Sequence, residues 1–197
     1  LLADASSPTY DQRGLEDEWA ELTVAEDAPL LNRVTQGLYA PGSSFKVVTA
    51  AAALEEGVVT PEAQFVDTGT FVIYGGKVTN YGGAVYGPHD FETALTQSIN
   101  TTFAKVGDKL GRGRLVRKMR AFGFWKVPPL DLPPGSVVAS GRYDGEELLS
   151  PEAKMDPLAV AWAACGQERV LATPLQMALV AAAVANGGEI MVPYVVE

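Results

Sequence analysis

The sequence predicts a fold of the α+β class, and three observations point to it. Residues 43–56 are rich in alanine and lie between a proline–glycine pair and Gly57. Such residues are typical start and stop signals of a helix. Residues 173–186 form a second apolar helical segment with Pro174 at its start. Residues 65–85 interleave Val, Ile, Tyr and Phe with paired glycines, which is typical of short strands and tight turns.

The other segments follow in chain order. Residues 1–35 are acidic and are expected to be loop-like. A helical turn is expected at residues 91–95, and helices are expected over residues 101–110 and 115–122. Residues 127–157 hold six of the 13 prolines and are expected to form an extended, wrapped loop.

The composition is that of a globular protein and excludes several classes of function. Of the 197 residues, 47% are hydrophobic and 20% are charged, with one cysteine, Cys165, and one histidine, His89. A disulfide framework, a zinc finger and a histidine-rich metal centre therefore lack their ligands. The formal net charge of -9 argues against nucleic acid as a partner. Residues 105–126 carry eight basic side chains and one acidic one, a local charge of +7 that leaves -16 elsewhere. The basic stretch from Arg112 to Arg120 is expected to be a solvated helix face, with a surface for an anionic polymer or lipid as the alternative.

Lys46 stands out because it is the only charged residue between Arg33 and Glu55 and lies inside a predicted helix. Apolar surroundings disfavour the ammonium form, so we expect the pKa of this lysine to be lowered and its amine to accept a proton near neutral pH. Ser43 lies three residues earlier on the same helical face, within hydrogen-bonding reach. Its place at the helix N-terminus supplies N–H groups that favour an alkoxide or an oxyanion.

These residues also have purely structural interpretations. A serine before an apolar helix is commonly its N-cap, and a lysine on such a helix commonly extends its amine to water. Ser98-Ile99-Asn100, taken alone, fits a turn or a helix cap. A serine–histidine hydrolase would need His89 beside a serine, but Pro88-His89-Asp90 is predicted to be an exposed turn. Cys165 is expected to be a small buried hydrophobe.

Taken together, these segments resemble the penicillin-binding transpeptidases, which share Ser-x-x-Lys and Ser-x-Asn motifs with the serine β-lactamases. The run from Asn32 to Lys46, in which Pro-Gly precedes Ser-x-x-Lys, is similar to the nucleophile segment of that family. Ser98-Ile99-Asn100-Thr101 is similar to its second motif. Three further segments, Gly166-Gln167, Ala172–Ala178 and Ala185–Gly188, resemble the stretch that precedes its third motif, so the resemblance covers nearly the whole chain.

The resemblance implies a transpeptidase fold in which helices pack on an antiparallel sheet, with the sheet incomplete in this chain. It implies a peptidoglycan D,D-transpeptidase that cross-links stem peptides at D-Ala-D-Ala through a serine acyl-enzyme and is inhibited by β-lactams. Ser43 would be the nucleophile, and neutral Lys46 would accept its proton. Ser98 would relay a proton to the leaving group, Asn100 would hold Lys46 and the substrate amide, and Ser43 and Asn100 would contact substrate. No metal or organic cofactor is implied.

One departure from the family pattern bears on activity. The sequence holds no Lys-Thr-Gly or close variant, and it ends where the strand that carries this third motif is expected to follow. Both ends of the chain read as cut, so residues 1–197 are expected to be part of a transpeptidase domain. Loss of one oxyanion donor typically lowers the rate about 10²–10³-fold, so this chain alone is expected to be impaired.

The resemblance also predicts a subclass, a location and partners. Phe45-Lys46-Val47-Val48 is more similar to the monofunctional class B enzymes than to the bifunctional class A enzymes, which commonly carry proline after this lysine. The resemblance implies the extracytoplasmic face of a bacterial cytoplasmic membrane, with an anchor outside this chain, and partners among cell-wall synthesis proteins. A D,D-carboxypeptidase, a β-lactam sensor domain and a non-catalytic scaffold with a protonated Lys46 are the open alternatives.

Overall fold

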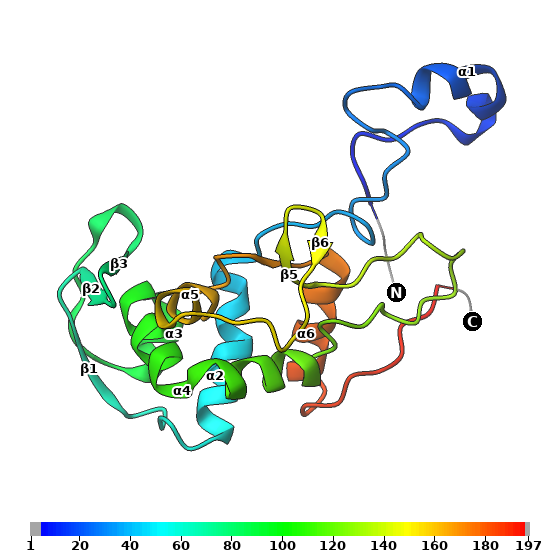
Figure 1. The fold of residues 1–197 in the computed structure, drawn as a ribbon. Coiled ribbons are helices and arrows are strands. Elements are labelled where there is room, and N and C mark those ends of the chain that lie inside the picture. The colour runs from blue at the N-terminus through cyan, green and yellow to red at the C-terminus, as the bar shows by residue number, and fades with distance from the viewer. Residues whose placement is uncertain (1–4, 196–197) are drawn as a thin grey trace.

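A computed structural model describes residues 5–195 of the chain (Figure 1). The helices are α1 (Leu15–Leu22), α2 (Lys46–Glu55), α3 (Phe91–Thr96), α4 (Asn100–Ala121), α5 (Pro157–Ala163) and α6 (Pro174–Ala185). The strands are β1 (Gln64–Asp67), β2 (Thr70–Ile73), β3 (Gly76–Thr79), β4 (Gly87–Asp90), β5 (Gly141–Asp144), β6 (Glu147–Leu148) and β7 (Val170–Leu171). Short 3-10 turns are η1 (Gln12–Gly14), η2 (Gly42–Phe45) and η3 (Tyr81–Gly83). This mixture of helices and antiparallel strands confirms the predicted α+β class.

The centre of the body is α4, which packs against both α2 and α5 (Figure 1). Val48 and Ala52 of α2 are fully buried in this core, so the predicted alanine-rich helix is confirmed. Phe45, the last residue of η2, meets Phe124 edge-on with ring centroids 5.7 Å apart. Because burial of a phenylalanine side chain contributes about 1.5–3 kcal/mol, this contact anchors the turn that precedes α2.

The two helices predicted over residues 101–110 and 115–122 form one interrupted element, α4. Its break lies at Gly111, whose φ of +74° is open to glycine without steric cost. The helix predicted over residues 173–186 is confirmed as α6, whose N-cap hydroxyl on Thr173 accepts the backbone N–H of Gln176. No helix within residues 5–195 is both long enough and apolar enough to span a membrane.

The strands of residues 5–195 pair in three small antiparallel sheets: β1 with β4, β2 with β3, and β5 between β6 and β7. The β2–β3 hairpin confirms the short strands predicted over residues 65–85, and its buried side chains Ile73 and Val78 pack on Ala104 of α4 and Ala161 of α5. Helices therefore cover one face of this hairpin, and the hairpin brings its last residue, Thr79, to the start of α4.

The wrapped loop predicted over residues 127–157 is wrong at β5 and β6, which form a hairpin. Gly145 and Glu146 make its two-residue turn, with Gly145 at φ +60°. Glycine at the first position of a two-residue turn is a hairpin signal, but the surrounding prolines concealed it. Tyr143 of β5 is 8% exposed and donates its hydroxyl to the carbonyl of Ala139, so burial holds this strand in place.

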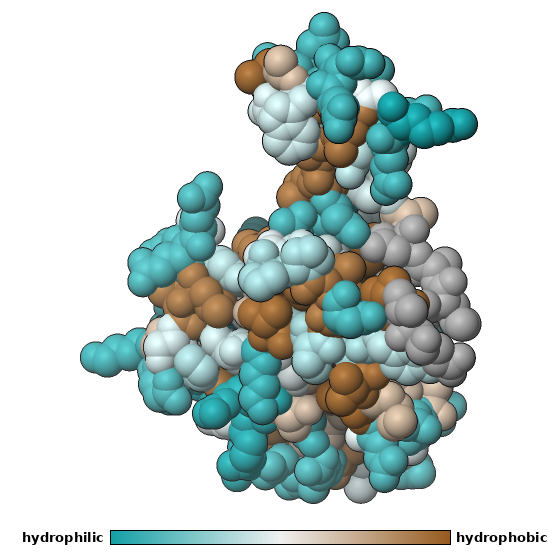
Figure 2. All heavy atoms as spheres, turned by 90° about the vertical axis from the view of Figure 1, so that its right-hand side faces the viewer, coloured by the Kyte–Doolittle hydropathy of each residue, from teal (hydrophilic) through white to brown (hydrophobic). Residues whose placement is uncertain are grey.

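The prediction of a loop over residues 1–35 is wrong at α1, which stands off the body as an arm (Figure 1). Glu16, Asp17 and Glu18 occupy its first turn, where the positive end of the helix dipole favours acidic side chains. The acidic run is therefore a helix start. α1 has no buried residue, and the surface of the arm is largely hydrophilic (Figure 2), as expected of a charge run.

His89 does not lie in an exposed turn, so that prediction is wrong. It belongs to β4 and is 8% exposed, because β4 pairs with β1 and the ring faces α4. One ring nitrogen, Nε2, lies 2.8 Å from the hydroxyl of Thr102, and Nδ1 lies 2.8 Å from the carbonyl oxygen of Gly87. Both ring nitrogens of this histidine therefore have partners in the core.

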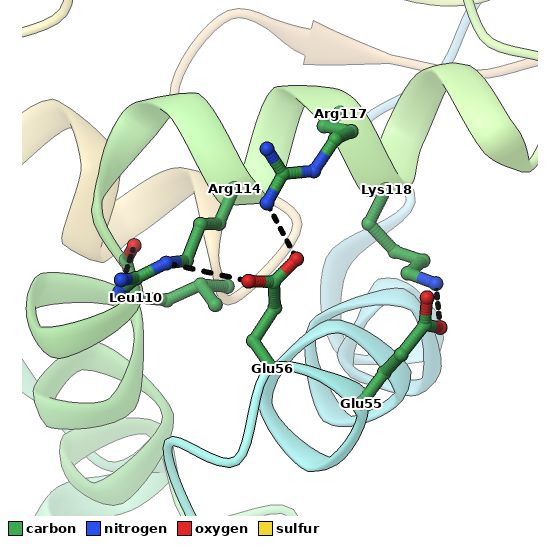
Figure 3. A network of polar contacts seen from close by, with 6 residues as sticks. All are labelled: Glu55, Glu56, Leu110, Arg114, Arg117 and Lys118. Atoms are coloured by element: carbon green, nitrogen blue, oxygen red, sulfur yellow. Dashed lines mark hydrogen bonds and ion pairs between the residues drawn. The ribbon is translucent and has the colours of Figure 1, made fainter.

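The basic stretch of α4 faces the C-terminal end of α2 (Figure 3). Arg114 and Arg117 form ion pairs with Glu56, and Lys118 forms one with Glu55. The arginine side chains are about half exposed, at 49% and 65%, which agrees with the predicted solvated face. These contacts join α2 to α4 at the end of α2 that lies away from Lys46.

Candidate active site

Lys46 is the first residue of α2, and only 1% of it is exposed. The core contact of Phe45 fixes the preceding turn, so the lysine side chain enters the interior instead of reaching water. The ring of Phe103 on α4 lies 5.4 Å from its Nζ atom. The predicted burial of this amine is confirmed.

Four polar atoms surround the Lys46 amine. Nζ lies 3.2 Å from the hydroxyl oxygen of Ser43 and 2.9 Å from that of Ser98. It also lies 2.6 Å from the carbonyl oxygen of Ser98 and 2.6 Å from Oδ1 of Asn100. The structure thus brings together the four residues that the sequence predicts for the site, from η2, α2, the α3–α4 link and the start of α4.

The hydrogen-bonding capacity of these four atoms accommodates a neutral amine as well as an ammonium, whose three N–H groups would also find acceptors here. The carbonyl oxygen of Ser98 and Oδ1 of Asn100 can only accept hydrogen bonds, whereas the hydroxyls can donate or accept. A neutral lysine amine has two N–H groups and one lone pair. When both N–H groups donate to the two acceptor oxygens, the lone pair is left for a proton from the Ser43 hydroxyl.

The surroundings of the amine shift its pKa downward. Burial lowers the pKa of Lys46, because desolvation disfavours the ammonium. Cys165 acts in the opposite direction, but burial raises the pKa of its thiol to about 12, so it is neutral at ordinary pH. Among the described residues, no carboxylate forms an ion pair with Lys46. Cys165 is itself 2% exposed, which confirms its predicted burial.

Ser43 is exposed on η2, and two glycines hold the backbone beside it. The N–H of Gly42 donates to the carbonyl of Gly166 at 2.8 Å. A Cβ atom on Gly166 would lie 2.0 Å from the carbonyl oxygen of Gly42, so only glycine permits this approach. Ser44, the other serine of the turn, donates its hydroxyl to the carbonyl of Pro41 instead. The geometry therefore distinguishes Ser43 from its neighbour.

Ser98 lies in the tight link between α3 and α4, and Asn100 is the first residue of α4. Ser98 has a φ of +57°, a left-handed conformation that costs a non-glycine residue about 1–2 kcal/mol, and both its carbonyl and its hydroxyl contact Lys46. Asn100 donates its Nδ2 to the carbonyl of Thr79 at 3.0 Å, which leaves Oδ1 facing Lys46. The sequence did not indicate Thr79, because a backbone carbonyl leaves no trace in a side-chain pattern.

This cluster has the parts of a nucleophilic site. An exposed hydroxyl lies within hydrogen-bond reach of a buried amine whose pKa is lowered, which is how a serine is activated by an adjacent base. Ser98 offers a second hydroxyl through which a proton can pass. Within the part of the chain that the structure describes, no group of three or more His, Cys, Asp or Glu side chains is placed to hold a metal ion.

An α+β domain with a serine and a buried lysine one turn apart defines the class of Ser-x-x-Lys proteins. Residues 1–197 match the penicillin binding protein transpeptidase domain. The chain therefore belongs to the penicillin-binding protein transpeptidase family.

Relatives of known name agree with this assignment. The peptidoglycan D,D-transpeptidase PbpA of Mycolicibacterium smegmatis is 36% identical over 100% of this chain and 40% of that protein. The peptidoglycan D,D-transpeptidase MrdA of Salmonella typhimurium is 31% identical over 98% of this chain and 32% of that protein. The chain thus spans 40% or less of the length of these curated relatives. The predicted class B assignment fits both.

Solved structures confirm the predicted transpeptidase fold. The penicillin G acyl-enzyme complex of penicillin-binding protein A from M. tuberculosis matches with a TM-score of 0.83 at 34% identity, over 98% of this chain and 45% of that chain. The D,D-transpeptidase domain of a peptidoglycan glycosyltransferase from Eggerthella lenta matches with a TM-score of 0.84 at 34% identity, over 96% of this chain and 47% of that chain.

Proposed function

We propose that the protein is a class B, serine-type peptidoglycan D,D-transpeptidase that β-lactams inhibit. The observation that carries the proposal is the buried Lys46 amine of lowered pKa, 3.2 Å from the exposed Ser43 hydroxyl. Two relatives bear this activity in their names, and the M. tuberculosis relative was solved as a penicillin G acyl-enzyme.

The first half-reaction forms a serine ester. Neutral Lys46 takes the hydroxyl proton of Ser43 while the serine oxygen attacks the carbonyl carbon of the penultimate D-Ala in a D-Ala-D-Ala terminus. The C–N bond to the terminal D-Ala then breaks, and Ser98 passes a proton from the Lys46 ammonium to the leaving amine. Free D-Ala departs, and the stem peptide stays on Ser43 as an ester.

The second half-reaction transfers the peptide. An amine of a neighbouring stem peptide attacks the ester carbonyl, and its proton passes through Lys46 to the departing Ser43 oxygen. A β-lactam enters the first half-reaction in the same way, since its ring carbonyl takes the place of the D-Ala carbonyl. Its leaving nitrogen remains tethered to the acyl group, so the ester persists.

Asn100 holds the reacting groups in place. Its Oδ1 fixes Lys46 at 2.6 Å, and, together with Ser43, it faces the substrate amide in the proposed complex. Hydrogen-bond contacts of this kind keep the amine within the range of about 2.6–3.2 Å that proton transfer requires. Side chains of the chain itself carry every proton in this scheme.

The substrate also sets the location and the partners that we propose. Wall polymer is cross-linked outside the cell, so the site acts at the extracytoplasmic face of a bacterial cytoplasmic membrane. Donor and acceptor peptides arrive on newly made strands. Cell-wall synthesis proteins that polymerise those strands are therefore the proposed class of partner.

Product analysis tests the proposal against its alternatives. The full-length protein is incubated with a peptide ending in D-Ala-D-Ala and an acceptor amine, and the products are identified by mass spectrometry. We expect D-Ala release together with a peptide–acceptor product, both lost in Ser43→Ala and kept in Ser44→Ala. Hydrolysed peptide alone would indicate a carboxypeptidase. Penicillin adducts without peptide turnover would indicate a sensor, and inert protein would indicate a scaffold.

A further inference from the structure

A buried carboxylate that no catalytic step uses lies behind the Lys46 site. Asp67, the last residue of β1, is 1% exposed, and within residues 5–195 it forms no ion pair. Its Oδ1 accepts hydrogen bonds from the N–H of Gly69 at 2.9 Å and the hydroxyl of Thr101 at 2.6 Å. Its Oδ2 accepts from Nδ2 of Asn80 and the N–H of Tyr86, both at 2.8 Å.

These four donors keep the side chain ionised in the core. Burial raises the pKa of Asp67, but the hydrogen bonds from Thr101, Tyr86, Gly69 and Asn80 together outweigh it and lower the pKa. Hydrogen bonds to an ionised acceptor are roughly twice as strong as neutral ones. Asp67 therefore holds its partners more rigidly than a neutral side chain would.

The network reaches the active site through the chain neighbours of its members. Thr101 follows Asn100, and its backbone N–H donates to Oδ1 of Asn80 at 3.1 Å while its hydroxyl donates to Asp67. Thr79 precedes Asn80, and its carbonyl accepts Nδ2 of Asn100 at 3.0 Å. The residue after Asn100 and the carbonyl that orients its carboxamide are thus both tied to the Asp67–Asn80 pair.

We propose that Asp67 and Asn80 are positioning residues that set the Asn100 carboxamide against Lys46, with Thr101 as the link. This inference rests on the proposed function, because it gives the network a part in the acylation of Ser43. The network touches neither the reacting hydroxyl nor the amine. It acts through Asn100 alone.

The proposal predicts a kinetic signature distinct from lost stability. When Asn100 moves away from Lys46, the amine loses an acceptor that favours its ammonium form, so the pKa of Lys46 falls further. The acid limb of acylation then moves to lower pH, while the rate falls because the amine is less well placed beside Ser43. Cys165 is the titratable group that faces Lys46 from beyond the site, and with a pKa of about 12 it stays neutral throughout.

The test compares two substitutions of Thr101 in the full-length protein. Thr101→Val keeps the shape of the side chain and removes the hydroxyl that donates a hydrogen bond to Asp67, whereas Thr101→Ser keeps this hydroxyl. The rate constant for acylation by penicillin G is measured per folded molecule from about pH 5 to pH 9. We expect Thr101→Val to lose about tenfold or more, since a misplacement of ~1 Å can cost about 10²-fold. Its acid limb should move to lower pH, and Thr101→Ser should match the wild type.

Other results of this experiment would overturn either the positioning role or the proposed function. If Thr101→Val keeps the wild-type acid limb and loses rate only with its folded fraction, Asp67 is structural and the positioning role is overturned. Thr101→Ala, which removes the hydroxyl without placing a second methyl beside the carboxylate, must show the same shift if the hydroxyl is the link. A wild-type protein that penicillin does not acylate would overturn the proposed function instead.

Discussion

Replacing Lys46 with methionine removes the proposed base while keeping an unbranched side chain of similar length in the core. A positioned general base contributes about 10²–10⁴-fold to the rate, and at about 1.36 kcal/mol per factor of ten this is about 2.7–5.4 kcal/mol of barrier. Because Nζ lies 3.2 Å from the Ser43 hydroxyl and its pKa is lowered, we expect acylation by a fluorescent penicillin to slow within that range.

The same substitution should leave the free energy of unfolding near or above that of the wild type. Removing one partner of a buried polar contact costs about 1–3 kcal/mol only where the other partner is left buried without a hydrogen bond. The acceptors it releases belong to Ser98, which is exposed, and Asn100, which is half-buried, so water reaches them. Lys126→Met, at an exposed position outside the site, is the matched control. Acylation of Lys46→Met within tenfold of the wild type, with both proteins folded in thermal melts, would refute the assignment of the base.

Three further predictions follow from the site and from the ion pairs. The rate of acylation should rise with pH as Lys46 loses its proton. Because burial lowers the pKa of Lys46, this rise should be centred below the ordinary lysine value of 10.5. A pH profile measured by stopped flow and centred at or above that value would contradict the desolvation argument. Gly166→Ala places a Cβ 2.0 Å from the Gly42 carbonyl oxygen, so it should slow acylation and lower the melting temperature, and wild-type values for both would show that the turn tolerates the contact. The hydrogen bond from Arg117 holds the pKa of Glu56 below its usual value in the folded protein. The ionised carboxylate therefore stabilises the fold at pH values above the pKa of Glu56 in the unfolded chain. This stability is lost as the pH falls through its pKa in the folded protein. Glu56→Gln should therefore lower the melting temperature at neutral pH, by an amount that shrinks at acidic pH and in about 1 M salt; a difference independent of both would count against the ion pairs.

Start and stop signals at helix ends explain which helices could be predicted from the sequence. α2 and α6 have glycine or proline at their ends and apolar faces between them. α6 formed where the pattern placed it, and α2 covers residues 46–55 of the predicted 43–56, with a 3-10 turn before it. α1 was hidden because an acidic run reads equally as solvated loop and as a first turn favoured by the helix dipole. His89 was misplaced because its burial depends on the pairing of β1 with β4, which local sequence does not encode.

Some residues of the candidate site could also be predicted from local sequence, and others could not. Ser43 and Lys46 are three residues apart, so local spacing predicts their contact, although the turn that joins them is 3-10 and not α-helical. Ser98 and Asn100 come from 52 and 54 residues further along, and only the family resemblance linked them to Lys46. Asp67 gave no signal, since a lone acid at a strand end is usually solvated. The reduced activity expected of this chain alone stays a prediction.

The measurement that tests the central claim most directly is the intact mass of the full-length protein after incubation with penicillin G, followed by peptide mapping. If Ser43 is the nucleophile, the wild type and Ser44→Ala each gain one penicillin mass, located on Ser43, and Ser43→Ala gains none. An adduct that persists in Ser43→Ala, or one that maps to Ser44 or Ser98, would contradict the account.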